Sequence, residues 1–551
     1  MPDWPARCGR AGAQHYNAAM QKTSAAPVPA EITADDVDTC VRVLRAIEAD
    51  RSHLTRLDRE QRRELLTLAG LVSKPERRDL VRMAKAFRRA EREAAKAHDR
   101  ALVERAALRV QRKSPVYAPL KLELPTPEDV DESAALKHER ACYVCKQPFA
   151  KVHRYYDSMC EPCGDFNYAK RELTADLDRH YALVTGARVK IGYQAALKLL
   201  RAGAHVVATT RFPVDAASRY AQEPDFGAFR DRLQIYGVDL RHTPSVELLA
   251  QFLAARLPRL DHILNNACQT VRRPPGFYRH LLEQESAPLE ALPERWRGVL
   301  AQQNELHALL AGTRSRERGG SALLAAGLGQ AEGLVHSAEL SQRRYIDEDL
   351  RASEELFPRQ RYDEDRQQVD LRAVNSWRLR LDEVATPELL EVHLVNAIAP
   401  YVLNARLKPL MLRTPERHKH VVNVSAMEGQ FYRTTKTDKH PHTNMAKAAL
   451  NMMTRTSAPD FVKDGIHMNA VDTGWVTDED PVVHALRKAE QGFSPPLDVI
   501  DGAARKAEEG FAPPLDIIDG AARIVDPIFV GRLTGAHVWG QFLKDYKPAP
   551  W

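Results

Sequence analysis

A glycine-bearing turn lies in the stretch Tyr181–Gly192, which reads YALVTGARVKIG. A short apolar strand is expected to lead into a Thr-Gly turn and then into a helix that closes with the sequence RAG at 201–203. Gly186 permits a tight turn, and Gly192 permits close packing of the helix on the strand. The first turn of the helix offers unpaired N–H groups and a partial positive charge. These residues at this spacing predict a cradle for the pyrophosphate of a nucleotide.

Four cysteines form a second arrangement suited to chemistry. They stand in two Cys-x2-Cys pairs separated by fourteen residues, namely Cys142, Cys145, Cys160 and Cys163. Thiolates at this spacing supply two ligands from each of two tight turns, which predicts a closed, structural Zn²⁺ site of the kind found in zinc ribbons and treble clefs. A redox dithiol pair and an iron–sulfur cluster are the alternatives. Because the second pair closely precedes the strand at 181, we expect the module to pack against the domain that follows.

Polar residues stand at the ends of the apolar segments that follow the turn. In chain order they are Arg211, Asp239, Asn266, Asn396, Ser425 and Lys447. In this order the segments resemble the short-chain dehydrogenase/reductase superfamily over 181–268 and about 387–543. The resemblance implies an α/β fold built on a Rossmann-type, doubly wound parallel sheet. It also implies hydride transfer between NAD(P)(H) and a carbonyl or alcohol.

The resemblance implies a cofactor-binding loop of the pattern TGxxxGxG. Its members here would be Thr185, Gly186, Arg188, Lys190, Ile191 and Gly192. Lys190 takes the place of the middle glycine, so the turn must accommodate a residue with a side chain. A similar basic replacement occurs in the pteridine-reductase branch of the family.

Arg211 follows the second strand, where NADP-preferring members of the family contact the 2′-phosphate. We therefore expect NADP(H) as the cofactor, with NAD(H) less favoured. A surface arginine without this role is the alternative, because Asp215 follows closely.

Other cofactor contacts are implied further along the chain. Asp239 and Leu240 would contact the adenine ring. Asn266 and Ala267 would form the family's NNAG element, in which Cys268 replaces the glycine. We interpret Cys268 as a small buried thiol and not as a nucleophile.

A last cofactor-binding element is implied beyond Lys447. The segment IHMNAVDTGWVT at 466–477 resembles the strand and turn that lie over the nicotinamide. Gly474 belongs to this turn, and Thr477 could bond the carboxamide or a phosphate.

The catalytic end departs from the family pattern. Counting back from Lys447, the tyrosine of YxxxK falls on Thr443, and the helper serine falls on Ala426, next to Ser425. Adjacent strand residues point to opposite faces, so Ser425 replaces Ala426 only if the strand bulges. Losing a general acid typically lowers a rate by about 10²–10⁴. Asn396 fits the family's proton-relay asparagine.

Three groups near the expected active site could replace the missing phenol. Tyr432 lies in the loop after the strand, and His440 and His442 precede the helix that carries Lys447. The alternative is that they are ordinary solvated or packed side chains.

Composition is typical of a multi-domain protein without membrane spans. The chain has 551 residues, of which 44% are hydrophobic, and a formal net charge of +6. No apolar run is long enough to span a bilayer, and the first residues lack the apolar core of a secretory signal. A cytoplasmic location is the simplest expectation for the cysteines.

We expect five consecutive regions. They are a disordered N-terminus at 1–32, a helical region at 33–113, a linker at 114–140, the zinc module at 141–170 and the dehydrogenase-like domain at 178–551. Thr33 with Asp36, and Asp58, indicate helix starts. The segment 79–113 has eleven Lys/Arg against five Asp/Glu, but the acids are interspersed, which favours a solvated helix over a nucleic-acid-binding face.

Two additions interrupt the dehydrogenase-like pattern. The insertion at about 270–385 is interpreted as a lid, a partner-binding arm or a partly disordered segment. A near-identical eighteen-residue sequence occurs twice in tandem over 487–522. The leading hypothesis is an NADP(H)-dependent oxidoreductase with a small carbonyl or alcohol substrate, able to form a homo-oligomer. A non-catalytic NADP(H)-binding sensor or scaffold is the alternative, and nucleic-acid binding is a weaker one.

Overall fold

The computed structural model describes residues 32–112, 135–312, 331–350, 353–363, 366–432, 436–476 and 513–551. Thr477, most of the expected linker and most of the tandem repeat lie outside these residues. The chain divides into two compact units, residues 1–92 and 93–551, which are described separately. No helix within the described ranges is long and apolar enough to cross a membrane.

The first unit is helical. It contains α1 (Ala34–Ala49), the 3₁₀ helix η1 (Arg51–Arg56), α2 (Arg59–Ser73) and the beginning of α3 (Arg77–Val103). Thr33 and Asp58 form capping boxes with Asp36 and Gln61, so each helix begins where the sequence indicated. No side chain of α1 or α2 is buried.

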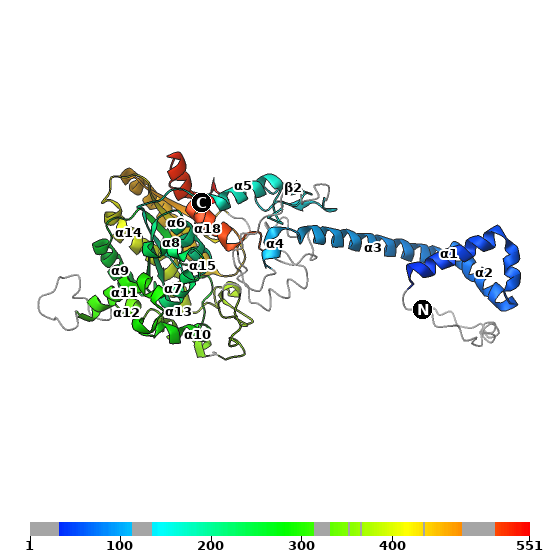
Figure 1. The fold of residues 1–551 in the computed structure, drawn as a ribbon, viewed down its shortest axis with the longest axis horizontal. Coiled ribbons are helices and arrows are strands. Elements are labelled where there is room, and N and C mark those ends of the chain that lie inside the picture. The colour runs from blue at the N-terminus through cyan, green and yellow to red at the C-terminus, as the bar shows by residue number, and fades with distance from the viewer. Residues whose placement is uncertain are drawn as a thin grey trace, which may run out of the picture. The chain divides into compact units, whose positions relative to one another are not determined.

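An eight-stranded sheet organises the second unit, and helices enclose it (Figure 1). Its strands are β3 (Tyr181–Thr185), β4 (His205–Thr210), β5 (Leu233–Gly237), β6 (His262–Asn265), β7 (Lys419–Ser425), β8 (Ile466–Asp472), β9 (Phe542–Lys544) and β10 (Lys547–Ala549). The order in space is β10-β9-β8-β7-β6-β3-β4-β5, and every pair is parallel except β9 with β10. The expected doubly wound parallel sheet is therefore confirmed.

Helices cover both faces of this sheet. The connecting helices are α6 (Lys190–Arg201), α7 (Pro213–Ala221), α8 (Phe226–Phe229), α9 (Thr243–Arg256), α13 (Thr386–His393), α14 (Ala399–Met411), α15 (Pro441–Phe461) and α18 (Ile517–Thr534). Short turns are η3 (Arg230–Arg232), the π-helix η9 (Leu394–Ile398), η10 (Met427–Gly429) and η11 (Val462–Asp464). Alternate strand residues serve opposite cores, with Val184 packed toward α6 and α18, and Leu183 toward α9 and α14.

The cysteine module packs on the Rossmann-type domain, as expected. It consists of α4 (Ala107–Arg112), the antiparallel pair β1 (Arg140–Ala141) and β2 (Pro148–Phe149), and α5 (Glu161–Glu172). Arg171 of α5 donates from both terminal nitrogens to Asp516, at 2.6 and 2.8 Å, just before α18. Tyr156 donates to Asp519 at 2.6 Å. These buried ionic and hydrogen-bonded contacts hold the module in one position.

The described parts of the insertion are folded against the same domain. They contain α10 (Pro275–Glu285), η4 (Leu289–Ala291), α11 (Glu294–Gly312), α12 (Glu332–Val335), η6 (Glu339–Gln342), η7 (Asp347–Leu350) and η8 (Ser376–Arg378). Phe277, Tyr278 and Phe357 of the insertion form a small core with Phe212, which follows β4. Gln303 of α11 accepts a hydrogen bond from the backbone N–H of Gly237 on the edge strand β5.

Candidate functional site

The glycine turn lies at the carboxyl end of β3, where strand order reverses between β4 and β6. In doubly wound sheets, ligands bind at this switch point. Gly186 has φ 67° and Lys190 has φ 56°. Both are left-handed, a conformation that favours glycine, so Lys190 keeps the turn at the cost of backbone strain.

Gly192 brings the first turn of α6 against the loop that follows β6. A Cβ atom at Gly192 would overlap Asn266 Nδ2 and the carbonyl oxygen of Gly186. Asn266 Nδ2 donates to the Thr185 carbonyl at 3.0 Å, and the N–H of Ala267 donates to Thr185 Oγ1 at 3.0 Å. The sequence-predicted residues of the two loops therefore meet at the switch point.

Arg188 and Arg211 are held by other side chains of the chain. Arg188 Nη1 lies 2.6 Å from Asp215 Oδ2, and Nη2 donates to Gln367 of the insertion at 3.2 Å. Arg211 Nη2 donates to the hydroxyl of Tyr278 at 2.7 Å, and its guanidinium stacks over that ring at 4.7 Å. Residues of the insertion thus help to fix the side chains of both arginines.

The residues expected at the adenine ring also contact the insertion. The N–H of Asp239 donates to the Gly333 carbonyl at 2.8 Å. Burial disfavours its carboxylate, but the guanidinium of Arg241, 2.5 Å away, leaves the pKa of Asp239 below its usual range. Leu240 is buried.

One face of α15 carries a polar stripe that meets the end of β7. Lys447 Nζ donates to the Val424 carbonyl at 2.7 Å, and Ser425 Oγ donates to Asn451 Oδ1 at 2.6 Å. One turn before Lys447, the Thr443 hydroxyl is buried without a hydrogen-bond partner in the described part of the chain. Buried polar atoms without partners are uncommon and call for a ligand, a water or a functional reason.

The end of β7 shows no bulge that would exchange the roles of Ser425 and Ala426. Ser425 pairs in register with Asp472, and Ala426 is extended, with φ −163° and ψ 165°. The Ser425 hydroxyl points to α15, and the family's serine position is occupied by the methyl group of Ala426. The catalytic assignment of Ser425 stays a prediction.

Asn396 lies in the π-helix η9, between α13 and α14. Its side chain accepts from the N–H of Gln269 at 2.8 Å and donates to the carbonyl of the same residue at 3.2 Å. π-helical turns occur preferentially at functional sites. Asn396 thereby ties the helix to the loop after β6.

The three candidate replacements for the phenol have different surroundings. Tyr432 is 59% exposed. His440 stacks on Trp377 with ring centroids 3.9 Å apart, and burial lowers its pKa. His442 is buried, with Nε2 3.7 Å from Glu388 Oε1. Within the described ranges, none of the three donates a hydrogen bond to Thr443 or Lys447.

The turn after β8 joins the site to the cysteine module. Gly474 has φ 76°, and its N–H donates to Asp472 Oδ1 at 2.7 Å. Burial raises the pKa of Asp472 to about 6. The N–H of Trp475 donates to the Tyr143 hydroxyl, in the first cysteine pair's turn, at 2.9 Å.

Buried ion pairs fasten the insertion over this end of the sheet. Arg272 pairs with Asp349 through both terminal nitrogens and donates to Glu391 at 3.0 Å. Glu391 also accepts from Arg241 at 2.9 Å. The side chains of Arg272, Asp349 and Glu391 are 6%, 0% and 8% exposed. The described part of the insertion is folded against this end of the sheet, and its interpretation as a lid or a partner-binding arm stays a prediction.

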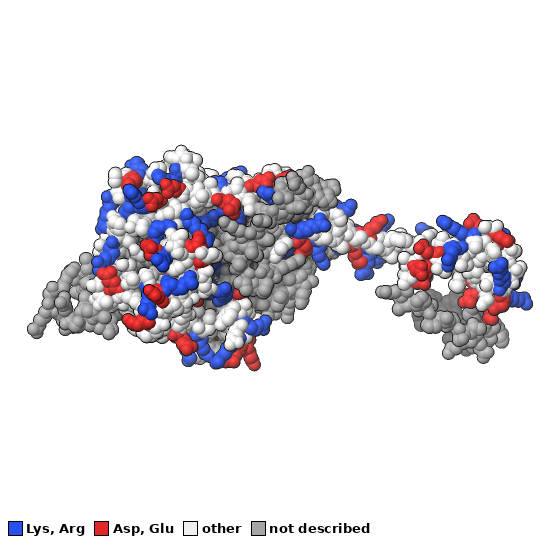
Figure 2. All heavy atoms as spheres, viewed as in Figure 1, with Lys and Arg blue, Asp and Glu red and all other residues white. Residues whose placement is uncertain are grey.

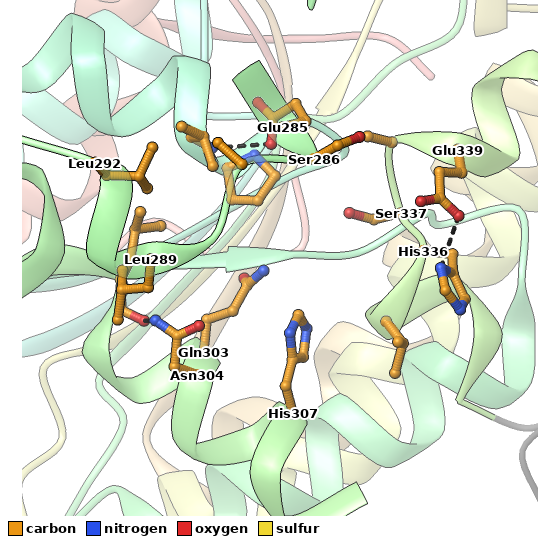
Figure 3. A pocket seen from close by; sticks show the side chains of 16 residues that line it. Glu285, Ser286, Leu289, Leu292, Gln303, Asn304, His307, His336, Ser337 and Glu339 are labelled. Carbon is orange, nitrogen blue, oxygen red and sulfur yellow. Dashed lines mark hydrogen bonds and ion pairs between the residues drawn. The ribbon is translucent and has the colours of Figure 1, made fainter. Parts of the chain in front are cut away.

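A pocket of ≈ 190 Å³ lies between the insertion and the start of α7 (Figure 3). Glu285 of α10 caps that helix by accepting from the N–H groups of Val214 and Asp215 at 3.1 and 2.8 Å. Burial raises the pKa of Glu285 to about 7. His307 and His336 line the opposite side (Figure 3). None of the predicted cofactor residues lines this pocket.

The four cysteines converge as their spacing predicts. Cys142 and Cys145 lie on the hairpin turn between β1 and β2, while Cys160 caps α5 and Cys163 lies in its first turn. All four sulfur atoms lie within 4.8 Å of one another, and Sγ of Cys145 and Cys160 are 3.6 Å apart. The four thiols therefore form one cluster that could hold a metal ion.

Comparisons with known proteins agree with this topology. A sequence profile described as short chain dehydrogenase matches residues 180–285, and one described as Enoyl-(Acyl carrier protein) reductase matches residues 373–491. An uncharacterized protein of Acanthamoeba polyphaga mimivirus is 31% identical over 373 residues, covering 66% of this chain and 69% of that protein. The chain belongs to the short-chain dehydrogenase family.

Solved short-chain dehydrogenase structures are similar at lower identity. The Pseudomonas aeruginosa RhlG/NADP active-site complex is 17% identical, with 67% of this chain and 95% of that chain covered and a TM-score of 0.37. NADPH-bound carbonyl reductase from chicken fatty liver is 16% identical, with 68% and 100% covered and a TM-score of 0.37.

Sequence reasoning missed several residues that shape this short-chain dehydrogenase site. Tyr278 and Gln367 position its arginines, Glu285 caps α7, and Tyr143 reaches the turn after β8. No local signal marks them, because their partners lie far away in sequence. One interpretation was wrong: Cys268 is exposed and not buried.

Proposed function

We propose that this chain is an NADP(H)-dependent oxidoreductase that acts on a small carbonyl or alcohol, with a proton donor other than the family's tyrosine. The proposal rests on the switch point, where Gly186, Lys190 and Gly192 meet Asn266 and Ala267. Left-handed backbone at Gly186 and Lys190 makes the tight turn and Gly192 the close helix packing that a pyrophosphate loop needs, and the first turn of α6 attracts negative charge.

Arg211 is the proposed contact for the 2′-phosphate, with Arg188 nearby as a second cation. Stacking on Phe212 and Tyr278 holds the Arg211 guanidinium in one orientation. A planar guanidinium binds phosphate oxygens in pairs, which favours NADP(H) over NAD(H). When bound, the nicotinamide would supply or accept the hydride.

Lys447 and Thr443 are the proposed residues at the reacting end, with Asn396 as a positioning group. Lys447 is fixed by the Val424 carbonyl and would hold the nicotinamide ribose. The unpartnered Thr443 hydroxyl could donate a hydrogen bond to a carbonyl oxygen. An aliphatic hydroxyl does not release its proton near neutral pH, so the rate should be about 10²–10⁴ below that of an enzyme with a phenol.

Calorimetric titration with NADPH and NADH, combined with turnover on a panel of carbonyl compounds, tests the proposal. We expect tighter binding of NADPH and slow turnover that Lys447→Ala abolishes. Arg211→Ala should remove the preference for NADPH without changing NADH binding. Absence of heat with either coenzyme would refute cofactor binding itself.

A second candidate is a non-catalytic NADP(H)-binding protein. The observation that favours it is the state of the catalytic groups: Ser425 is bonded to Asn451, His440 is stacked on Trp377, and Tyr432 is exposed. Tight NADPH binding without turnover on the panel would favour this candidate. In that case the insertion is the proposed surface for a protein partner or a second copy of the chain.

Zn²⁺ is the proposed ion of the cysteine module, in a structural role. Zinc–sulfur bonds of about 2.3 Å in a tetrahedron place sulfurs about 3.8 Å apart, close to the 3.6 Å between Cys145 and Cys160. Four thiolates leave no open coordination position. Nucleic-acid binding is not favoured, because Lys/Arg and Asp/Glu side chains are intermixed on the face that Figure 2 shows.

A further inference from the structure

A row of histidines crosses the amino ends of the central strands. His262 of β6 pairs in register with His420 of β7, which pairs with His467 of β8. Ring centroids of successive members lie 5.8 and 5.3 Å apart. His467 is the second residue of β8, which ends at Asp472, so the row lies at the opposite end of the sheet from the proposed cofactor site.

His537 joins the row from the turn after α18. Its ring stacks on His467 with centroids 4.2 Å apart, and its Nδ1 lies 3.2 Å from Nε2 of His420. Gly531 of α18 makes room for this contact, because a Cβ atom there would overlap the His537 ring. Three elements distant in sequence therefore direct imidazoles to one point.

The ring nitrogens of His420, His467 and His537 have the spacing of metal ligands. One nitrogen of each lies within 4.8 Å of the other two. Metal–nitrogen bonds of about 2.0–2.1 Å in a tetrahedron separate ligand nitrogens by about 3.3 Å. The 3.2 Å between His420 and His537 matches this separation.

A backbone carbonyl fixes the orientation and tautomer of one proposed ligand, His467. Nδ1 of His467 lies 3.1 Å from the Lys419 carbonyl oxygen and must carry the proton to donate to it. The lone pair is then on Nε2. A carbonyl that fixes the tautomer of a histidine is the usual outer contact of a metal ligand.

The three histidines lie inside the folded chain: His420 and His467 are buried, and His537 is partly buried. His420 is 1% exposed, and its Nδ1 has no hydrogen-bond partner within the described segments. Neutral imidazoles cannot form salt bridges, but they retain the lone pairs that bind metals.

Fixed charges near the row are partly neutralised. Arg259 pairs with Asp261 at 2.6 Å and with Glu416 at 3.3 Å. Lys419 donates to the Thr414 carbonyl at 2.5 Å. Arg417 donates to the carbonyls of Val462 and Lys463. Carboxylates thus compensate Arg259, whereas Lys419 and Arg417 contact neutral carbonyls, so a divalent ion at the row would have to tolerate these two positive charges.

We propose that His420, His467 and His537 bind a divalent transition-metal ion of borderline softness, of which Zn²⁺ is the reference case. Imidazole nitrogens select such ions over Mg²⁺ and Ca²⁺. Three neutral ligands leave the ion its full charge and a fourth position for water or an anion. The ion would link β7, β8 and the turn after α18. This site is separate from the four cysteines and does not depend on the proposed oxidoreductase activity.

Metal counting on the full-length protein tests the proposal. The protein is stripped with a chelator, reloaded with Zn²⁺ or Co²⁺, passed through a desalting column and analysed for metal per chain. We expect His537→Gln to lose one equivalent relative to the unchanged protein. His205→Asn is the matched control, because His205 stacks on Tyr181 outside the row and should keep both equivalents.

Absorption spectra of the Co²⁺-loaded protein show which of the two sites has lost its metal ion. Thiolate ligands give Co²⁺ an intense near-ultraviolet charge-transfer band, whereas imidazole ligands give only weaker visible bands. We expect His537→Gln to lose visible intensity and keep the thiolate band, which also shows that the variant is folded. Gly531→Ala, which displaces His537 without removing a ligand, should weaken the same equivalent at least tenfold. Equal metal content in the unchanged protein and in His537→Gln would overturn the proposal.

Discussion

Gly192 packs directly on the side-chain amide of Asn266, so that even a methyl group at Gly192 would overlap it. We predict that Gly192→Ala lowers NADPH affinity at least tenfold and destabilises the fold by about 1–3 kcal/mol, because overpacking displaces both loops of the switch point. Titration calorimetry and urea unfolding measure the two effects. Gly298→Ala is the control: this glycine lies in α11 with open space around it, and alanine should stabilise the helix by about 0.5–1 kcal/mol. Unchanged NADPH binding by Gly192→Ala would contradict the assigned site.

Thr443 stands one helical turn before Lys447, where the family has its phenol. We predict that Thr443→Tyr combined with Ala426→Ser raises the rate of NADPH-dependent carbonyl reduction by about 10²–10⁴, because it restores a general acid and its hydrogen-bond partner. Steady-state rates at saturating NADPH measure the change. Thr443→Phe with the same Ala426 change controls for added volume. Equal rates for the Tyr and Phe variants would show that the missing phenol is not what limits the reaction.

Asp472 is buried, and its pKa is raised from 3.8 to about 6. Its carboxyl holds its proton more tightly in the folded chain than in the unfolded chain, so stability falls as pH rises from about 4 to about 6 and stays low above that range. The difference of two pKa values corresponds to about 3 kcal/mol. Asp472→Asn, which keeps an acceptor for the Gly474 N–H, should therefore be more stable than the unchanged protein at pH 7.5. Denaturant unfolding at pH 4.5 and 7.5 checks this, and an equal gain at both pH values would contradict it.

Two ion-paired arginines of the insertion, Arg272 and Arg359, differ strongly in burial. Arg272→Leu removes the buried guanidinium that pairs with Asp349 and Glu391. This should lower the free energy of unfolding by about 3–5 kcal/mol. The exposed pair Arg359–Glu354 has side chains 76% and 64% exposed, so Arg359→Ala should cost under about 1 kcal/mol. Thermal unfolding and limited proteolysis compare the two variants. Equal costs would mean that the buried pairs do not hold the insertion in place.

The cysteine module should depend on its metal. We predict that Cys145→Ser removes the thiolate-bound equivalent of Zn²⁺ and speeds hydrogen exchange in residues 140–172, because a closed four-thiolate site stabilises a small module directly. Cys40→Ser, in the first unit, should leave metal content unchanged. Hydrogen exchange by mass spectrometry gives the regional readout. Unaltered exchange in the module after metal loss would make the site dispensable for folding.

Some features of this protein depend on a few neighbouring residues and were predicted from them. The turn at Gly186, the close approach at Gly192 and the clustering of the cysteine pairs follow from backbone sterics and ligand spacing. The capping boxes at Thr33 and Asp58 follow in the same way. The doubly wound parallel sheet was expected from the resemblance of the ordered segments to the short-chain dehydrogenase/reductase superfamily, and the structure confirms it.

Other features depend on side chains that only the folded chain brings together. No local sequence pattern predicts that the insertion contacts Arg188 and Arg211. The same is true of the hydrogen bonds between Glu285 and the start of α7 and between Trp475 and Tyr143. The histidine row shows the reason most clearly. His262, His420, His467 and His537 come from separate strands and a turn, and only the parallel register places them side by side. Sequence alone thus determined which local structures can form, and tertiary structure decided which distant side chains meet, because strand register and crossover connections fix those distances.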